Sequence, residues 1–189
     1  MAAGVDVEHF QQSFSKALKA VALYMNPARM LEQAGIPVYL SYVISGLAFT
    51  VLFLQVGLDM HRAGTRSPGG VVLLLFLGLL FGTAGVALLA LVAWAVSCRF
   101  GPTWKLPDVL KAFPLAYTPT LIYAVVGLVF SVVVGWNTAI SFGVTGMLWA
   151  LAPILVLIRE MSGGKVVACI TGATSCGILT LCFLALVVI

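Results

Sequence analysis

The chain has 189 residues, of which 62% are hydrophobic and only 8% are charged, and its formal net charge is +4. A soluble domain carries roughly 25% charged residues, so most of this surface must face lipid. Lys and Arg lie in short stretches beside apolar runs rather than on a polar domain, which excludes a nucleic-acid-binding surface. Composition therefore predicts an integral membrane protein.

The N-terminal segment, residues 1–36, has the pattern of an amphipathic helix before the first apolar run. Apolar side chains recur at spacings of three and four, at Val7, Phe10, Phe14, Leu18 and Val21. We predict a helix on the cytoplasmic leaflet, with a helix packed under the bundle as the alternative. Asn26 and Pro27 break this helix. The chain start lacks a basic patch followed by a cleavage site, so no signal peptide is expected.

Five apolar segments are each long enough to cross roughly 30 Å of hydrocarbon as a helix. They cover about residues 38–58, 71–96, 114–134, 139–158 and 166–188. No Asp, Glu, Lys, Arg or His lies inside them, where a charge costs about 3 kcal/mol or more. The predicted fold class is all-α: a polytopic membrane protein with five transmembrane helices over 37–189, plus the N-terminal interfacial helix.

The basic residues alternate between the two sides of the predicted membrane domain. Eight of them precede the first span or follow the second and fourth: Lys16, Lys19, Arg29, Arg99, Lys105, Lys111, Arg159 and Lys165. Only Arg62 and Arg66 belong to the other side. The positive-inside rule places the larger group in the cytoplasm. We therefore predict a cytoplasmic N-terminus and an outside C-terminus, in the inner (plasma) membrane if the cell is prokaryotic.

Two connections are expected on the cytoplasmic side. In residues 98–113, "PDVLKAF" predicts a short surface helix with Asp108 in its first turn, and Trp104 and Phe113 suit the headgroup level. In "LIREMSGGKVVA", basic residues hold the turn in the cytoplasm, and the glycines allow a tight reversal.

Small residues mark the expected helix contacts, because close backbone packing drives helix association in lipid. The fifth span carries Ala168, Gly172, Cys176 and Thr180 at a spacing of four, and the second carries the GxxxG pair Gly78 and Gly82, followed by Gly85. Further small residues are Ser41, Ser45, Gly46, Gly143 and Gly146. We expect internal contacts, with a homo-oligomer face as the alternative. Pro119 and Pro153 are expected to bend their helices.

The residues that commonly carry catalysis are nearly absent. There is no HExxH motif, no Asp pair within a span and no CxxC among the four cysteines, and "SGGK" lacks the rest of a phosphate loop. Asp59 and His61 could bind a metal weakly, but a solvated helix end is the preferred interpretation. We predict no catalytic residue, no metal and no cofactor.

A few polar side chains fall inside the spans and could line a pathway. They are Thr50, Gln55, Thr83, Thr118, Thr171, Thr174 and Ser175. Hydroxyls in membrane helices commonly bond their own backbone or a neighbouring helix, so these residues indicate transport only weakly.

The segment "WALAPILVLIREMSGGKVVACI" resembles the junction of the fourth and fifth helices in the Yip1-domain family. The matching positions are Trp149, Arg159, Glu160, Ser162, Gly163 and Ala168. "YMNPARMLEQ", with Asn26 and Pro27, and "LKAFPLAYTPTLIY" are similar to the family's pre-membrane segment and third helix. The short N-terminus looks closest to the prokaryotic-type members. The resemblance implies a non-enzymatic membrane protein, an assembly or trafficking partner, and supplies no catalytic residues.

The predicted function is that of an accessory or interaction protein acting through a cytoplasmic face built from 1–36, 98–113 and 159–165. Its candidate interaction residues are Arg99, Lys105, Lys111, Arg159, Glu160 and Lys165. The expected partners are the lipid bilayer and a membrane or cytoplasmic protein. A small carrier, a channel or a subunit of a transport complex is the alternative. A membrane enzyme using His61 or Asp59 is a third class.

Overall fold

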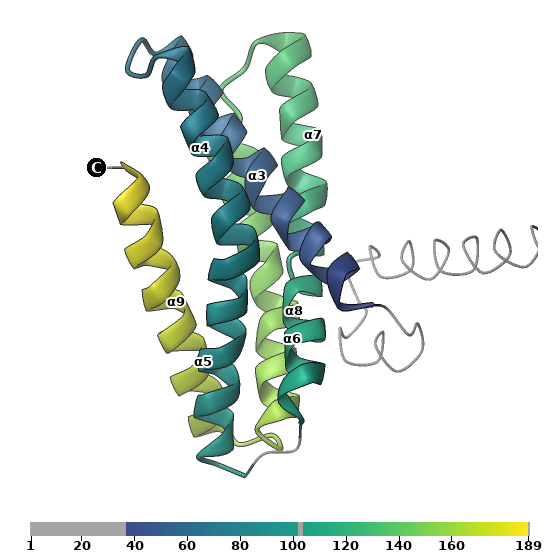
Figure 1. Cartoon of the computed structure of the whole chain (residues 1–189). Coiled ribbons are helices and arrows are strands. Elements are labelled where there is room, and N and C mark those ends of the chain that lie inside the picture. Colours follow the sequence, from purple (N-terminus) through teal and green to yellow (C-terminus); the bar gives the residue numbers. More distant parts are fainter. Residues whose placement is uncertain (1–36, 102–103, 189) are drawn as a thin grey trace, which may run out of the picture.

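The computed structural model describes residues 37–101 and 104–188, and every regular element in these ranges is a helix (Figure 1). Within them, four helical stretches are long and apolar enough to cross a membrane: Val38–Arg62, Pro68–Cys98, Leu106–Val134 and Ala139–Met161. The last helix is apolar too. The chain is thus an all-helical bundle suited to a membrane. The predicted interfacial helix lies outside the described residues.

The helices extend beyond the predicted apolar cores, and two of them contain a π-helical stretch. In chain order the elements are α3 (Val38–Arg62), α4 (Pro68–Leu80), η1 (Phe81–Gly85), α5 (Val86–Cys98), α6 (Leu106–Leu115), α7 (Thr118–Val134), η2 (Ala139–Val144), α8 (Thr145–Met161) and α9 (Val166–Val188). α4, η1 and α5 form one continuous rod, and η2 leads directly into α8. α8 also continues through Pro153 without interruption.

Local signals in the sequence begin and end several of these helices. Ser67 accepts a hydrogen bond from the Gly70 N–H at 3.3 Å, and Pro68 begins α4. Gly135 ends α7 in the left-handed conformation, with φ of 72°, and its N–H donates to the Ser131 carbonyl. Glycine adopts this conformation without steric cost, so α7 stops there and the chain can turn back.

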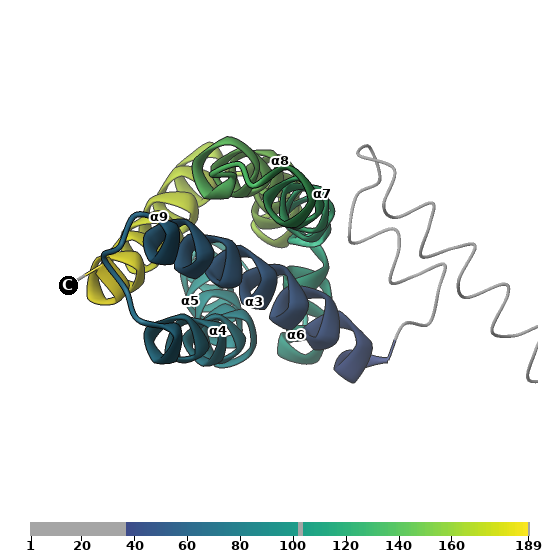
Figure 2. The same ribbon diagram turned by 90° about the horizontal axis from the view of Figure 1, so that it is seen from above.

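α3 runs through the middle of the bundle. Seen from above, α4 and α5 lie on one side of it and α7 and α8 on the other, with α9 at one end (Figure 2). Its buried face includes Phe49 and Phe53, and Phe49 meets Phe81 and Tyr117 edge-on with ring centroids 4.6 and 5.0 Å apart. The packing around α3 therefore joins the two halves of the bundle.

The third span starts earlier than predicted. The predicted short helix with Asp108 in its first turn is confirmed as α6, but the predicted position of this helix at the membrane surface is wrong. α6 packs against α3 and α5, and Phe113, predicted at the headgroup level, is fully buried. A break at Ala116 and Tyr117 separates α6 from α7, and Pro119 lies in the first turn of α7 instead of bending a helix. The reason is that the apolar face of α6 is buried by the neighbouring helices, while Asp108 stays exposed.

The outer surface of the bundle is apolar along most of its length. Large exposed side chains include Phe76, Leu80, Val133, Ile140 and Ile170. Contiguous apolar surface of this extent is incompatible with water and is what lipid tails contact. The bundle is therefore embedded in a membrane.

Candidate functional site

Most of the described basic residues lie at one end of the bundle, on the α5–α6 and α8–α9 connections and on the adjoining parts of α6 and α8. The segment between α5 and α6 and the turn between α8 and α9 are neighbours at the bottom of Figure 1. We call this the cationic end and define it by Arg99, Lys105, Lys111, Arg159 and Lys165. Lys111 is half-buried and the other four are exposed.

A hydrogen bond joins these two connections. The Lys165 ammonium, just before α9, donates to the carbonyl of Phe100, just after α5. The Trp94 indole N–H also donates to the Trp104 carbonyl at 3.3 Å, which holds the approach to α6 against α5. These bonds bring Arg99 and Lys165 together although they are far apart in sequence.

The turn between α8 and α9 is compact. Gly163 and Gly164 both have positive φ, of 62° and 80°, and donate to the carbonyls of Glu160 and Arg159. Ser162 is fully buried, and its hydroxyl donates to the Ile158 carbonyl at 2.8 Å. The structure therefore presents Arg159 and Lys165 on a turn whose backbone groups are hydrogen-bonded within the protein.

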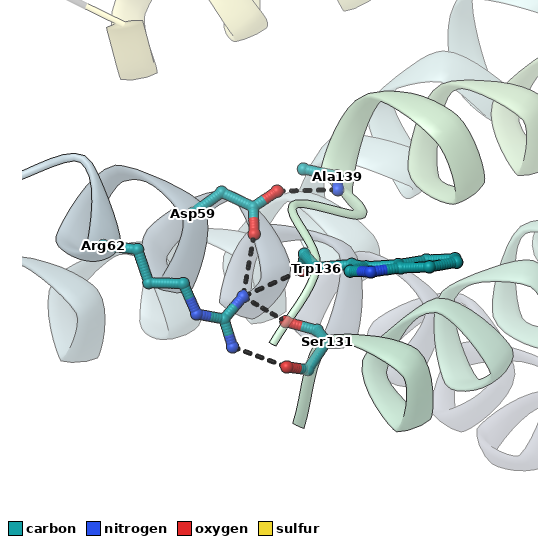
Figure 3. Close-up of polar contacts among 5 residues, drawn as sticks. All are labelled: Asp59, Arg62, Ser131, Trp136 and Ala139. Carbon is teal, nitrogen blue, oxygen red and sulfur yellow. Dashed lines mark hydrogen bonds and ion pairs between the residues drawn. The ribbon is translucent and has the colours of Figure 1, made fainter. Parts of the chain in front are cut away.

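At the opposite end, Asp59 and Arg62 form a polar clamp with the α7–η2 connection (Figure 3). The Asp59 carboxylate accepts from the Ala139 N–H at 2.8 Å, at the start of η2. Its other oxygen lies 3.4 Å from Arg62, and the Asp59 side chain is only 16% exposed. The helix end is exposed at His61, as predicted, but Asp59 is partly buried because a neighbouring helix supplies the carboxylate's partner.

Arg62 caps the end of α7 from the side. Its guanidinium donates to the Ser131 carbonyl at 2.6 Å, to the Ser131 hydroxyl at 2.8 Å and to the Trp136 carbonyl at 2.9 Å. The Ser131 carbonyl already accepts from the Gly135 N–H, so Arg62 adds a second donor to it and places a cation at the negative end of the α7 dipole. Sequence reasoning missed this clamp. The available sequence signal was the pair Asp59 and Arg62, three residues apart at the end of the first apolar run. The connection between the third and fourth runs, on the same predicted side, carries no charge.

Gln55 has a buried side-chain amide on α3. It lies one helical turn before Asp59 and so further from the end of that helix. Its amide N–H donates across the helix interface to the Ala124 carbonyl of α7. Its carbonyl oxygen is buried and has no hydrogen-bond partner within the described residues. Gly127 faces it closely, since a Cβ there would lie 2.9 Å from the Gln55 amide nitrogen. Gln55 therefore joins α3 to α7 and leaves one acceptor unsatisfied.

The other predicted pathway residues mostly bond their own helices. Thr50, Thr83, Thr118, Thr171 and Ser175 each donate to a carbonyl three or four residues earlier. His61 lies 2.8 Å from the Arg66 carbonyl through its Nδ1. Over the described ranges, no group of three metal-ligating side chains occurs. The structure does not bring these residues together into one site.

The small-residue stripes lie at helix interfaces inside the bundle. A Cβ at Gly78 would lie 2.6 Å from the Phe49 carbonyl oxygen, and one at Gly82 would lie 2.5 Å from that of Ser45. The Ser45 hydroxyl donates to the Gly82 carbonyl at 2.6 Å. On α9, Ala168, Gly172 and Cys176 are buried toward α5 and α8. These residues pack helix against helix within one chain.

Comparison with known protein families, with characterised proteins and with solved structures finds no match. The function is therefore argued from the site alone.

Proposed function

We propose that the chain is a non-enzymatic integral membrane protein that acts as an accessory or assembly partner through its cationic end. In this proposal the domain has five transmembrane helices, with α9 as the fifth, and residues 1–36 form the interfacial helix. The N-terminus and the cationic end face the cytoplasm, and the C-terminus lies outside. The resemblance to the Yip1-domain family remains a prediction that agrees with this layout.

The observation that carries the proposal is the unequal use of charge at the two ends. Arg99, Lys105 and Arg159 are exposed on connections that Lys165 holds together. At the other end, the Arg62 guanidinium donates hydrogen bonds to Ser131, Trp136 and Asp59 within the protein. Exposed cations on an ordered backbone favour recognition of an acidic surface, and such charge complementarity gives specificity more than raw affinity.

Recovery of partners from native membranes tests the proposal. The tagged full chain is extracted in mild detergent, and the proteins that accompany it are identified and quantified. We expect a defined partner to be lost from the triple variant Arg99→Gln/Lys105→Gln/Arg159→Gln and retained by Arg66→Gln, the matched change at the other end. Lys165 is left unchanged because it joins the two connections. Equal recovery by the triple variant would remove the cationic end from the proposal.

A transport component is the second candidate, and Gln55 is the observation that favours it. A buried amide with an unpaired acceptor is unusual at this depth, and polar groups inside membranes often mark solute pathways. Liposomes containing the purified chain alone separate the two functions. Solute flux that is abolished by Gln55→Leu supports transport, whereas absence of flux in the wild type supports the interaction function.

A further inference from the structure

We propose that the cationic end binds the phosphate headgroup of an anionic phospholipid in the leaflet that it faces. This inference rests on the proposed function in using the same surface, but it requires no protein partner. The ligand chemistry is a phosphate diester carrying net negative charge, presented at the membrane surface.

The depth of the basic side chains is the first argument. Arg99 directly follows α5, Lys105 directly precedes α6, Arg159 lies in the last turn of α8 and Lys165 directly precedes α9. Membrane helices leave the hydrocarbon where their apolar runs end, and lipid phosphates lie at that level. These four cations therefore reach headgroup phosphates without extending far from the bundle.

The second argument is that the backbone carrying these cations is held in place. The bond from Lys165 to the Phe100 carbonyl uses one of the three ammonium donors, so two remain for a ligand. The bond from Trp94 to Trp104 holds the chain just before Lys105. A surface ordered before binding loses less conformational entropy when it takes up a ligand.

The third argument is the balance of charge among the described residues. The cationic end has five basic side chains, and its acids are Asp108 and Glu160. At the opposite end the corresponding residues are Arg62, Arg66 and Asp59, so the excess of basic side chains is smaller there. Basic clusters beside a membrane helix attract anionic lipid, by about fivefold in affinity for each cation near the surface.

The turn between α8 and α9 is short enough to keep its basic side chains at the headgroup level. It consists only of residues 162–165, so Arg159 and Lys165 stay close to the ends of their helices. A phosphate group is small enough to be held by two or three such side chains.

The test uses the purified full chain in nanodiscs of phosphatidylcholine with or without phosphatidylglycerol. Lipids that stay with the protein after brief detergent extraction are quantified by native mass spectrometry. We expect selective retention of phosphatidylglycerol, weakening as salt concentration rises. In Arg99→Gln/Lys105→Gln/Arg159→Gln the selectivity should fall by about fivefold for each charge removed, and Arg66→Gln should keep it.

Equal retention of the two lipids by the wild type would overturn the proposal, and so would selectivity that salt leaves unchanged. Excess inorganic phosphate is added in a separate arm. It should leave the bound lipid in place, and displacement by it would show that free phosphate is the ligand. The salt series uses only the wild type, so it stays decisive if the triple variant fails to fold. Because no cellular partner protein is present, the result is independent of partner recovery.

Discussion

At the scale of single residues, Arg62 does the most to hold the α7–η2 connection. Replacing it with Ala removes the donors to Ser131 and Trp136 and leaves Asp59 without its cation. Hydrogen bonds to charged groups are worth about 1.5–3 kcal/mol, but Arg62 is 31% exposed, so we expect a loss of about 1–2 kcal/mol in the free energy of unfolding. Arg62→Lys keeps the charge without the planar fork and should fall between wild type and Ala.

The measurement for Arg62 is reversible unfolding in detergent micelles. Asp59→Asn serves as the companion change, since it weakens the bond to the Ala139 N–H while keeping the side-chain shape. If Arg62→Lys were as stable as the wild type, the bidentate geometry would contribute nothing and the clamp would be reduced to an ion pair.

Gln55 leads to a second prediction, in which two opposing terms must be compared. Gln55→Leu loses the interhelical bond to Ala124, and such bonds are worth about 0.6 kcal/mol in membranes. It also removes a buried acceptor whose desolvation costs about 1–3 kcal/mol. We therefore expect stability that is unchanged or raised by about 1 kcal/mol, measured by the same unfolding assay. A large destabilisation would mean that the folded protein satisfies the Gln55 oxygen.

The residue types at these sites could be read from the sequence, but their partners could not. Asp59 and Gln55 were recognised as polar groups near or within the first span. The partners of both lie on α7 and η2, more than 60 residues away along the chain. Only the packing of α3 between the two halves of the bundle brings them together.

At the scale of elements, the contact of α3 with the α4–η1–α5 rod depends on Gly82. A methyl group there would meet the Ser45 carbonyl oxygen at 2.5 Å, and backbone cannot give way as a side chain can. We expect Gly82→Ala to cost about 1–3 kcal/mol, the range for overpacked sites. Gly177→Ala in α9 is the matched control, because its Cβ would meet no atom of the described residues within 4 Å.

For Gly177→Ala we expect no loss, and a gain of up to about 1 kcal/mol from the higher helix propensity of Ala. Thermal unfolding of the two variants in one detergent gives the comparison. Equal stability of Gly82→Ala and Gly177→Ala would contradict the close approach of η1 to α3.

A helix could be predicted from the sequence where the length of an apolar run determines it. It was harder to predict where contacts with other helices determine its position. The four long spans and α9 follow from runs of apolar residues bounded by charge, Pro or Gly. α6 does not, because "PDVLKAF" carries charges that suit either a surface helix or the end of a span. Its burial depends on α3 and α5, which cover Val109, Ala112 and Phe113. The π-helical stretches have no comparable sequence signal.

At the scale of the whole molecule, the account depends on which side of the membrane the cationic end faces. The positive-inside rule puts Arg99, Lys105, Lys111, Arg159 and Lys165 in the cytoplasm. Figure 1 shows the α5–α6 and α8–α9 connections at one end of the bundle and the end of α7, which the polar clamp contacts, at the other. The proposed interaction surface requires this orientation, whereas the proposed lipid site requires only anionic lipid in the leaflet that the cationic end faces.

Labelling of single cysteines in whole cells tests this orientation most directly. In a chain whose four native cysteines are replaced, Ala63→Cys reports on the α3–α4 connection and Asp108→Cys on the exposed start of α6. With a membrane-impermeant maleimide, we predict that Ala63→Cys reacts in intact cells and Asp108→Cys only after permeabilisation. The reverse pattern would place the cationic end outside and contradict the proposed function.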